Sequence, residues 1–159
     1  MTQIVMTMLQ CAILAMMPVV ELRAALPWAI ARGLDPWLSY VLCVLFNMVP
    51  VPFILLFIRK ILAWMQASRV EFFRKVATFV VEKGQRGFAR VQKYATVGLF
   101  LFVAIPLPGT GAWTGSLIAA LLDMKKSRAL LSIVLGVLTA GIIMSLITGG
   151  VLAGLDWLI

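Results

Sequence analysis

Residues 15–28 read Ala15-Met-Met-Pro18-Val-Val-Glu21-Leu-Arg23-Ala-Ala-Leu-Pro27-Trp28, which places a glutamate and an arginine in apolar sequence just after a proline. A second break, Ile105-Pro106-Leu-Pro-Gly-Thr-Gly111, occurs at the same point of the other half of the chain. Ionisable side chains at membrane depth are costly and usually face a cavity or a partner. Paired breaks in two halves of a membrane protein are typical of a substrate site near the bilayer midplane. The two stretches therefore predict a transport protein.

The composition of the chain is typical of a membrane protein. Of its 159 residues, 63% are hydrophobic and 13% are charged, and the mean hydropathy is +1.07. Soluble domains carry about 45–50% apolar and about 25% charged residues. The chain has no histidine, and its two cysteines, Cys11 and Cys43, lie in apolar stretches. We therefore expect an integral membrane protein in which the cysteines are small hydrophobes, with no metal site and no cofactor.

The two halves of the sequence resemble each other, which indicates an internal repeat. When residues 18–49 are aligned on 106–137, these positions are identical: Pro18/Pro106, Ala24/Ala112, Ile30/Ile118, Ala31/Ala119, Leu34/Leu122, Asp35/Asp123, Ser39/Ser127, Leu42/Leu130 and Val49/Val137. Internal repeats of this kind are a feature of transporter folds. We expect one membrane domain over 1–159, made of a first repeat (1–58), a basic amphipathic linker (59–93) and a second repeat (94–159). The aligned Asp35 and Asp123 precede helix starts and are expected to be N-caps.

Segment lengths predict the fold of each repeat. A spanning helix needs about 20 apolar residues, and the stretches 2–17, 19–33, 94–105 and 108–122 are all shorter. We expect an all-α protein in which each short pair forms a re-entrant helical hairpin, with tips at Pro18 and at 106–111. The segments 36–58 and 127–148 are long enough to cross, and Pro50 and Pro52 should break the first of them. One crossing per repeat makes the second repeat an inverted copy. Asn47, one turn before that break, should satisfy a freed carbonyl or face the cavity.

The linker carries most of the positive charge. Residues 59–93 contain nine basic and two acidic side chains, a net charge of +7. The positive-inside rule makes this segment cytoplasmic and puts both termini outside. Val70, Phe73, Val76 and Val80 recur at helical spacing opposite Glu71, Lys75 and Glu82, and Arg86, Arg90 and Lys93 follow on one face. We expect an amphipathic helix on the inner leaflet and no nucleic-acid partner, because topology accounts for the basic run.

The hairpin tips combine features of an anion site. The second helix of each hairpin would begin near the midplane, at Val19 and at residues 108–109, and helix N-termini expose unpaired N–H groups and partial positive charge. Two such ends facing each other favour an anion. Arg23 adds a guanidinium fork suited to phosphate. The predicted site residues are Pro18, Glu21, Arg23, Asn47, Pro106, Pro108, Gly109, Thr110, Gly111, Trp113 and Thr114, with Trp28 as a further wall.

Glu21 has a separate predicted role. It lies two positions from Arg23, and residues at that spacing do not face each other on a regular helix. A carboxyl that gains and loses a proton inside a transport site can couple transport to protons. We expect Glu21 to carry the coupling proton and Arg23 to hold an anionic group. The structural alternatives are that Glu21 stabilises a helix dipole, by about 0.3–1 kcal/mol, and that Arg23 snorkels to a headgroup.

Two stretches carry a family resemblance. Glu21-Leu-Arg-Ala-Ala-Leu-Pro27 and Pro106-Leu-Pro-Gly-Thr-Gly-Ala-Trp-Thr-Gly-Ser-Leu-Ile-Ala-Ala-Leu-Leu122 resemble the small multi-drug export protein family of prokaryotic membrane proteins, which implies the inner membrane. The predicted layout also resembles the DedA / VTT-domain superfamily. That resemblance implies lipid movement, including return of undecaprenyl phosphate, and proton-dependent drug tolerance. It puts Glu21 and Arg23 where charged residues of the first re-entrant loop are expected. The second loop departs from the pattern, because 106–115 holds no arginine and no acidic residue.

Three functions remain open from the sequence. The first is an ion-coupled transporter or flippase for an anionic lipid carrier of the polyprenyl phosphate type, or for another small anion. The second is a proton-coupled multidrug exporter that uses Glu21, and the third is a membrane scaffold that docks partners on the linker. We expect no enzyme, because one intramembrane carboxylate and no histidine leave no acid/base pair. A chain this short gives little wall for a pathway, so we expect a homodimer surrounded by membrane lipids.

Overall fold

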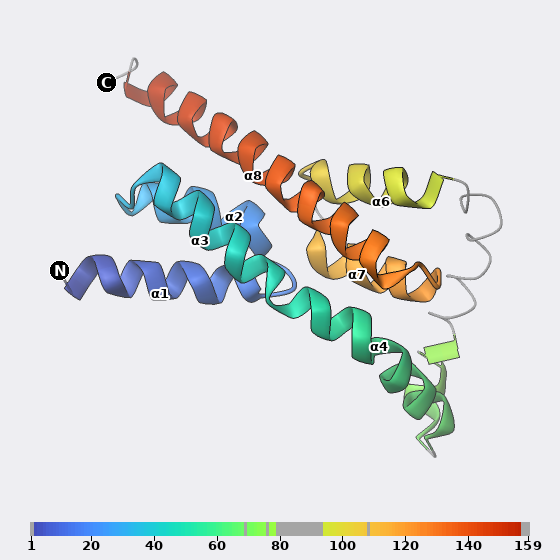
Figure 1. The fold of residues 1–159 in the computed structure, drawn as a ribbon. Coiled ribbons are helices and arrows are strands. Elements are labelled where there is room, and N and C mark those ends of the chain that lie inside the picture. The colour runs from blue at the N-terminus through green and yellow to red at the C-terminus, as the bar shows by residue number, and fades with distance from the viewer. Residues whose placement is uncertain (1, 69, 76, 79–93, 108, 157–159) are drawn as a thin grey trace.

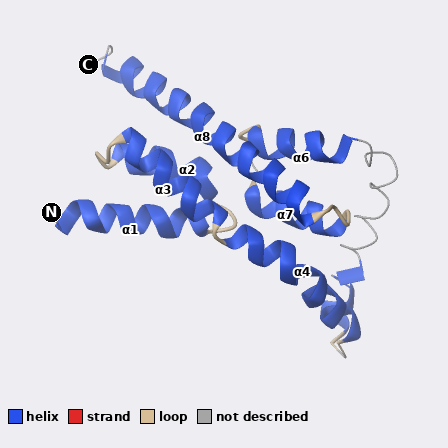
Figure 2. Ribbon diagram, viewed as in Figure 1, coloured by secondary structure: helices blue, strands red, loops and turns tan. Residues whose placement is uncertain are grey.

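The fold is built from helices. The computed structural model describes residues 2–68, 70–75, 77–78, 94–107 and 109–156. Within these residues every regular element is a helix and no strand occurs (Figure 2), which confirms the all-α prediction. The predicted linker helix falls largely on residues 79–93 and so lies outside the described residues. Its beginning is helical over 71–75, where Glu71 and Lys75 pair at 2.8 Å across one turn.

The first half is a hairpin followed by a long, broken helix. Helices α1 (Thr2–Met16) and α2 (Glu21–Ala31) are joined by a loop at 17–20, and α3 (Pro36–Met48) and α4 (Pro50–Ala67) follow. The Asp35 carboxylate accepts a hydrogen bond from the N–H of Leu38 at 2.8 Å, so its N-cap role is confirmed. The break at Pro50 is confirmed too, but α4 continues to Ala67, beyond the predicted end of the span at 58.

The second half repeats this order. Helices α6 (Ala95–Ala104) and α7 (Ala112–Leu121) flank a loop at 105–111, and α8 (Lys126–Asp156) follows. The N-cap prediction for Asp123 is wrong. Its backbone takes a left-handed conformation with φ 53°, three residues before α8 begins, and its carboxylate pairs with Arg59 of α4. The two halves thus share their order of helices, but the aspartates in the turns before α3 and α8 make different contacts.

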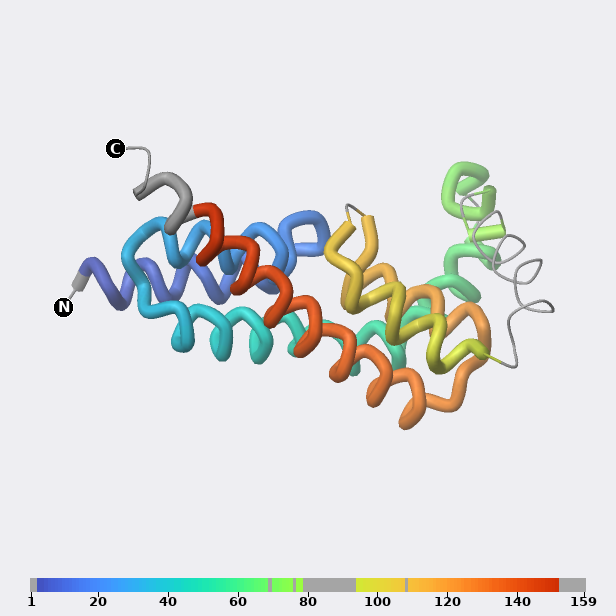
Figure 3. The backbone as a smooth tube through the Cα atoms, turned by 90° about the horizontal axis from the view of Figure 1, so that it is seen from above, coloured from blue at the N-terminus to red at the C-terminus, as the bar shows by residue number. Residues whose placement is uncertain are grey.

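The hairpins meet tip to tip between two long helices. Figure 1 shows α3–α4 and α8 running the length of the molecule, with the α1–α2 hairpin at one end and the α6–α7 hairpin at the other. Figure 3, turned by 90°, shows the loops of the two hairpins facing each other near the middle. Helix α1 starts and α8 ends at the same end of the molecule. Helix α4 ends, and α6 begins, at the opposite end.

Among the described residues, only the two long helices have the length of a membrane crossing. The combined helix Pro36–Ala67 has 32 residues, and the apolar part of α8, Lys126–Val151, has 26, each with a mean hydropathy of 2.6 over its best window. At 1.5 Å per residue these helices measure about 48 and 39 Å, against a hydrocarbon core of about 30 Å. Helix α1 has 15 residues and α2 has 11. Helices α6 and α7 have 10 each, so all four hairpin helices are shorter than the core is thick.

Small residues let the second hairpin pack closely. A Cβ added to Gly115 of α7 or to Gly136 of α8 would lie 2.6 Å from the side chain of Val103 on α6. Val103 is 1% exposed, so both glycines allow their helices to approach α6. In the first half, Cys11 and Cys43 are free, fully buried thiols whose sulfur atoms lie 3.2 Å apart, and they pack as small hydrophobes between α1 and α3. The centre between the hairpins is where the buried charges lie.

Candidate functional site

The first hairpin tip carries a buried ion pair. Nη1 of Arg23 lies 3.1 Å from Oε2 of Glu21, and the two side chains are 16% and 5% exposed. The expectation that these side chains do not face each other is wrong. Glu21 is the first residue of α2 and has φ 48°, so the spacing rule for a regular helix does not apply to it. A non-glycine residue in this conformation costs of order 1–3 kcal/mol and persists only where the surroundings enforce it.

The Glu21 carboxylate is held by the opposite hairpin. Oε2 accepts a hydrogen bond from the N–H of Ala112 at 3.2 Å, and Oε1 accepts one from the N–H of Trp113 at 3.0 Å. Those are the first two residues of α7, whose N–H groups have no partner within their own helix. Glu21 therefore caps α7 across the hairpin interface. The dipole it stabilises belongs to the second hairpin as well as to its own helix.

The Arg23 guanidinium is held by the other side of the same loop. Nη2 donates to the carbonyl oxygens of Val103 and Ile105 at 3.0 and 3.1 Å, and to Oγ1 of Thr110 at 2.9 Å. Nη1 donates to the carbonyl oxygen of Thr110 as well as to Glu21. Helix α6 ends at Ala104, so Arg23 satisfies carbonyl groups that its last turn leaves open. Arg23 points at the second hairpin and not out of the protein.

Together the two charges complete the interruption between α6 and α7. The anion sits at the positive N-terminus of α7 and the cation at the negative C-terminus of α6, which is the favourable placement for each. Helix ends at membrane depth need such partners, because hydrocarbon offers none. The ion pair is thus a structural part of the second hairpin. In this arrangement the Glu21 carboxylate is bound by N–H donors that could equally bind another anion.

A cavity of about 390 Å³ opens beside the ion pair. Besides Glu21 and Arg23, five predicted site residues line it: Pro18, Pro106, Gly109, Thr110 and Thr114. The rest of the wall is mainly apolar and comes from Val19, Val20, Ala24, Leu107 and Met144. The structure therefore brings most of the predicted site into one place. The cavity is thus lined by charged and hydrogen-bonding groups as well as by apolar side chains.

The other predicted site residues lie elsewhere. Gly111 lies behind the ion pair, where an added Cβ would overlap Glu21 and Arg23. The indole N–H of Trp113 donates to the carbonyl oxygen of Met16 at 3.0 Å and so caps α1. Asn47 is 2% exposed and lines a separate, much smaller cavity. Pro108 lies outside the described residues.

Trp28 is also away from the tips. Its ring lies under the guanidinium of Arg32, whose central carbon is 5.1 Å from the ring centroid. Sequence reasoning missed the main-chain groups of Val103, Ile105 and Ala112 that hold the ion pair. The signal for them was the helix break itself, because every helix end leaves polar groups that need partners. Nothing in the sequence indicated Met144 as part of the wall.

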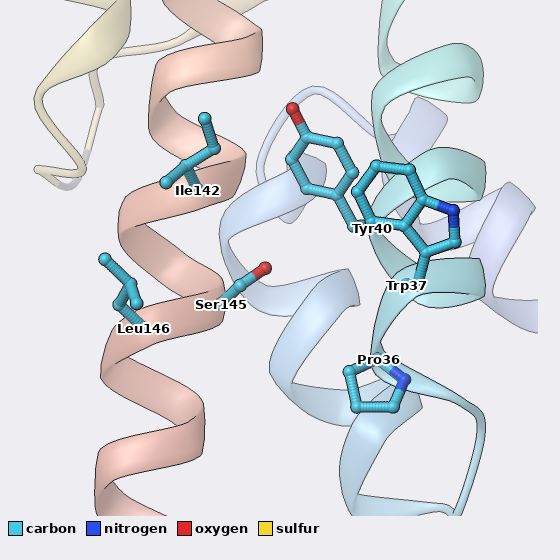
Figure 4. A pocket seen from close by; sticks show the side chains of 6 residues that line it. All are labelled: Pro36, Trp37, Tyr40, Ile142, Ser145 and Leu146. Atoms are coloured by element: carbon cyan, nitrogen blue, oxygen red, sulfur yellow. The ribbon is translucent and has the colours of Figure 1, made fainter.

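A second cavity of about 460 Å³ lies between α3 and α8. Figure 4 shows its lining: Pro36, Trp37 and Tyr40 from α3, and Ile142, Ser145 and Leu146 from α8. Trp37 stacks on Tyr40 with ring centroids 5.6 Å apart and is 72% exposed. The groove is almost wholly apolar and faces outward, as a surface covered by lipid does. It contains no charged group, so the tip cavity is the stronger candidate for a substrate.

The long apolar helices and the buried ion pair between two helix breaks define an integral membrane protein. Residues 21–143 match the family model described as "putative small multi-drug export protein". This range begins at Glu21, directly after the loop of the first hairpin, and includes the loop of the second hairpin and more than half of α8. The chain therefore belongs to the small multi-drug export protein family, a family of membrane transporters by its name. No curated protein and no solved structure matches it.

Proposed function

We propose that the protein is an ion-coupled transporter whose substrate binds in the cavity between the hairpin tips. The observation that carries this proposal is the environment of Glu21. Two backbone N–H groups and the Arg23 guanidinium converge on its carboxylate, in a site that is otherwise suited to an external anion. The chain's own carboxylate occupies this anion site.

This occupancy supports coupling between a proton and an anion. A protonated Glu21 has no negative charge, so it would bind the α7 N–H groups and Arg23 less strongly. An external anion could then take its place on the same donors. Proton and anion would bind together and leave together, which is the linkage that an ion-coupled transporter needs. Glu21 is therefore the proposed coupling residue, and Arg23 with the α7 N-terminus the proposed anion-binding group.

The cavity wall supports an amphiphilic substrate. Its lining includes the polar Arg23 and Thr110 together with the apolar Val19, Leu107 and Met144. Its volume of about 390 Å³ falls in the range of small-molecule sites and would hold a headgroup but not a long chain. We propose an anionic lipid carrier of the polyprenyl phosphate type, or a small anion with an apolar part.

The lengths of the hairpin helices support their being re-entrant. Four helices too short to cross form two hairpins that meet at their tips between two long helices (Figure 3). We propose that each hairpin enters from one membrane face and returns to it, which makes the second repeat inverted. The basic linker would then lie on the cytoplasmic face of a prokaryotic inner membrane. A homodimer would supply the wall that one chain lacks.

A proton-coupled multidrug exporter is the second candidate. The family name and the mostly apolar wall of the cavity favour it. In this mechanism Glu21 would exchange a proton for a cationic drug. Arg23, 3.1 Å from that carboxylate, opposes it, because a bound cation would have to displace the guanidinium.

The deciding experiment is ligand-dependent thermal stabilisation of the purified protein at several pH values. The ligands are undecaprenyl phosphate, anionic and zwitterionic phospholipids, and cationic drugs, tested on wild type and Glu21→Gln. As the pH falls, we expect the phosphate lipid to gain more stabilising effect on wild type than on Glu21→Gln, which should keep only the pH dependence that titration of the ligand imposes. Titration of the ligand itself is common to both proteins and drops out of the comparison.

The control removes an arginine from an ion pair away from the cavity. Arg59 of α4 pairs with Asp123 in an exposed position, and neither residue lines the cavity, so Arg59→Ala should behave as wild type with every ligand. An unchanged pH dependence in Glu21→Gln would eliminate Glu21 as the coupling group. Stabilisation by cationic drugs alone, in both proteins, would replace the anion transporter with the exporter.

A further inference from the structure

We infer that a single water molecule is bound behind the ion pair, between Asn47 of α3 and Arg23 of α2. Two buried polar atoms at this place have no hydrogen-bond partner among the described residues, Oδ1 of Asn47 and Nε of Arg23. Asn47 is 98% buried, with 2% of its surface exposed. Buried polar groups in folded proteins are almost always paired, with protein or with ordered water.

Both atoms border a cavity of the size of one water. It leaves about 10 Å³ for the centre of a water-sized sphere, and one bound water needs about 10–15 Å³ by this measure. Its polar lining comes from Glu21, Arg23 and Asn47, and its apolar lining includes Leu22, Val103 and Val137. The cavity shares Glu21 and Arg23, but no other residue, with the large cavity between the tips.

The chemistry of the lining selects water over an ion. The Nε–H of Arg23 donates, so the ligand must accept a hydrogen bond. Oδ1 of Asn47 accepts, so the same ligand must also donate. An anion without a proton cannot donate to Asn47, and a metal cation cannot accept the hydrogen bond that Nε–H of Arg23 donates. Water does both and has a second hydrogen left for the Glu21 carboxylate, which gives it the three partners typical of a buried water.

This water explains why a polar residue stands at position 47. Asn47 lies on α3, one turn before the break at Pro50, and through the water it would anchor Arg23 to that helix. Glu21 lines both the large cavity between the tips and the small cavity that would hold the water. If Glu21 is the coupling residue, which rests on the proposed function, this water is a group with which its carboxyl could exchange a proton.

Radiolytic footprinting of the full-length protein in lipid nanodiscs tests for the water directly. Hydroxyl radicals formed from a bound water oxidise the side chains around it. Leu22, Val103 and Val137 are each 1% exposed, so bulk solvent does not reach them. We expect oxidation of these three residues in wild type, and at least a fivefold fall in Asn47→Leu, which replaces the amide with an apolar side chain of similar size.

The matched control changes another buried polar group on the same helix. Ser39 of α3 is fully buried and its hydroxyl has no partner among the described residues, but it does not line this cavity. Ser39→Ala should leave the oxidation pattern unchanged. Unoxidised Leu22, Val103 and Val137 in wild type, or equal oxidation in Asn47→Leu, would overturn the inference.

A second variant covers the case in which Asn47→Leu does not fold. Ala140 of α8 lines the cavity and is 3% exposed, so Ala140→Val should fill it and abolish oxidation while Asn47 and Arg23 stay in place. If neither variant folds, the wild-type pattern alone decides. A melting temperature that rises with sodium, but not with choline at equal ionic strength, would instead assign the cavity to a cation. Because these readouts use no substrate, they stand or fall independently of the transport proposal.

Discussion

The two hairpin tips occupy aligned positions of the two halves and contribute opposite kinds of chemistry. In the alignment of the halves, Glu21 falls on Gly109 and Arg23 falls on Gly111. The first tip supplies two charged side chains. The second supplies main-chain groups, namely the carbonyl oxygens of α6 and its loop and the N–H groups that begin α7. One half holds the charges and the other half holds the polar backbone that binds them.

The difference explains why the second loop needs no charge of its own. A Cβ at Gly111 would overlap the very side chains that fill the aligned positions of the first tip. Glycine at position 111 leaves room for Glu21 and Arg23. The second tip therefore has no side chain where the first tip has a charged one, because the charged side chains of the first tip fill that space. Two hairpin tips that meet this closely cannot both put long charged side chains into the space between them.

Removing Arg23 should break this complementarity most severely. Arg23→Leu leaves the Glu21 carboxylate buried without its counter-charge and leaves the α6 carbonyl groups unpaired. Loss of one partner of a buried ion pair costs about 3–5 kcal/mol. We expect that loss in the free energy of unfolding, measured by denaturant titration in mixed micelles.

The double variant Glu21→Leu/Arg23→Leu is the control for Arg23→Leu. Replacing both charges by apolar side chains removes the uncompensated anion, so the double variant should be more stable than the single one. A double variant that is less stable than Arg23→Leu would mean that the α7 cap by Glu21 outweighs the cost of its buried charge.

Gly111→Ala should be the next most harmful change, and it tests the spatial half of the comparison. Gly111 has φ 152° and ψ −172°, a region that is essentially restricted to glycine. Its Cβ would also collide with both charged side chains. We expect a loss of about 2–4 kcal/mol from strain and overpacking together, in the same unfolding measurement.

Gly109→Ala separates the collision from the strain. Gly109 also has a positive φ, 79°, but a Cβ there meets nothing within 4 Å. Only the left-handed backbone penalty applies, about 1–2 kcal/mol. Equal losses in the two variants would mean that Glu21 and Arg23 move aside freely, and the space at Gly111 would then have no special role.

The order of the helices and the meeting of the tips were open to prediction from the sequence, because prolines and segment lengths determine them. The exact helix ends were not: α2 and α7 begin at Glu21 and Ala112, later than the predicted Val19 and 108–109, and α4 runs to Ala67. Nor were the contacts of the ion pair. The helical spacing rule separated Glu21 from Arg23, and it failed because Glu21 adopts φ 48°, which depends on contacts with residues 91 and 92 positions away. The backbone N–H groups that bind Glu21 could not be predicted from residue types either, because nearly every residue has such a group. Asn47 was placed near the site, but which cavity it borders depends on how α3 packs against the tips.

Thr110→Val should have a smaller effect and tests the side-chain contribution of the second tip. The Thr110 hydroxyl accepts from Arg23 at 2.9 Å and lies 2.9 Å from the carbonyl oxygens of Ile105 and Leu107, to one of which it donates. Hydrogen bonds between membrane helices average about 0.6 kcal/mol, with a maximum near 1.7. We expect a loss in unfolding free energy within that range.

Thr114→Val serves as its control. Thr114 lines the same cavity, and the change is equally conservative in shape. A loss for Thr110→Val as large as that for Arg23→Leu would show that the second tip binds Arg23 through this side chain and not chiefly through its backbone.

The aligned aspartates give the most discriminating test, and the exposed pair of Asp123 has the smallest expected effect. Asp35 caps α3, and an N-cap replaced by alanine costs about 0.5–2 kcal/mol, so Asp35→Ala should lose about 1 kcal/mol. Asp123 pairs instead with Arg59, and those side chains are 67% and 59% exposed. Exposed pairs contribute about 0–1 kcal/mol and weaken with salt. We therefore expect Arg59→Ala, which breaks the pair without altering the left-handed residue, to cost less than Asp35→Ala and to cost nothing at high salt. The Asp35→Ala loss should persist there, because the cap is a short hydrogen bond within one helix turn. If both losses responded to salt alike, the two turns would be equivalent, and the difference between the halves would be confined to the tips.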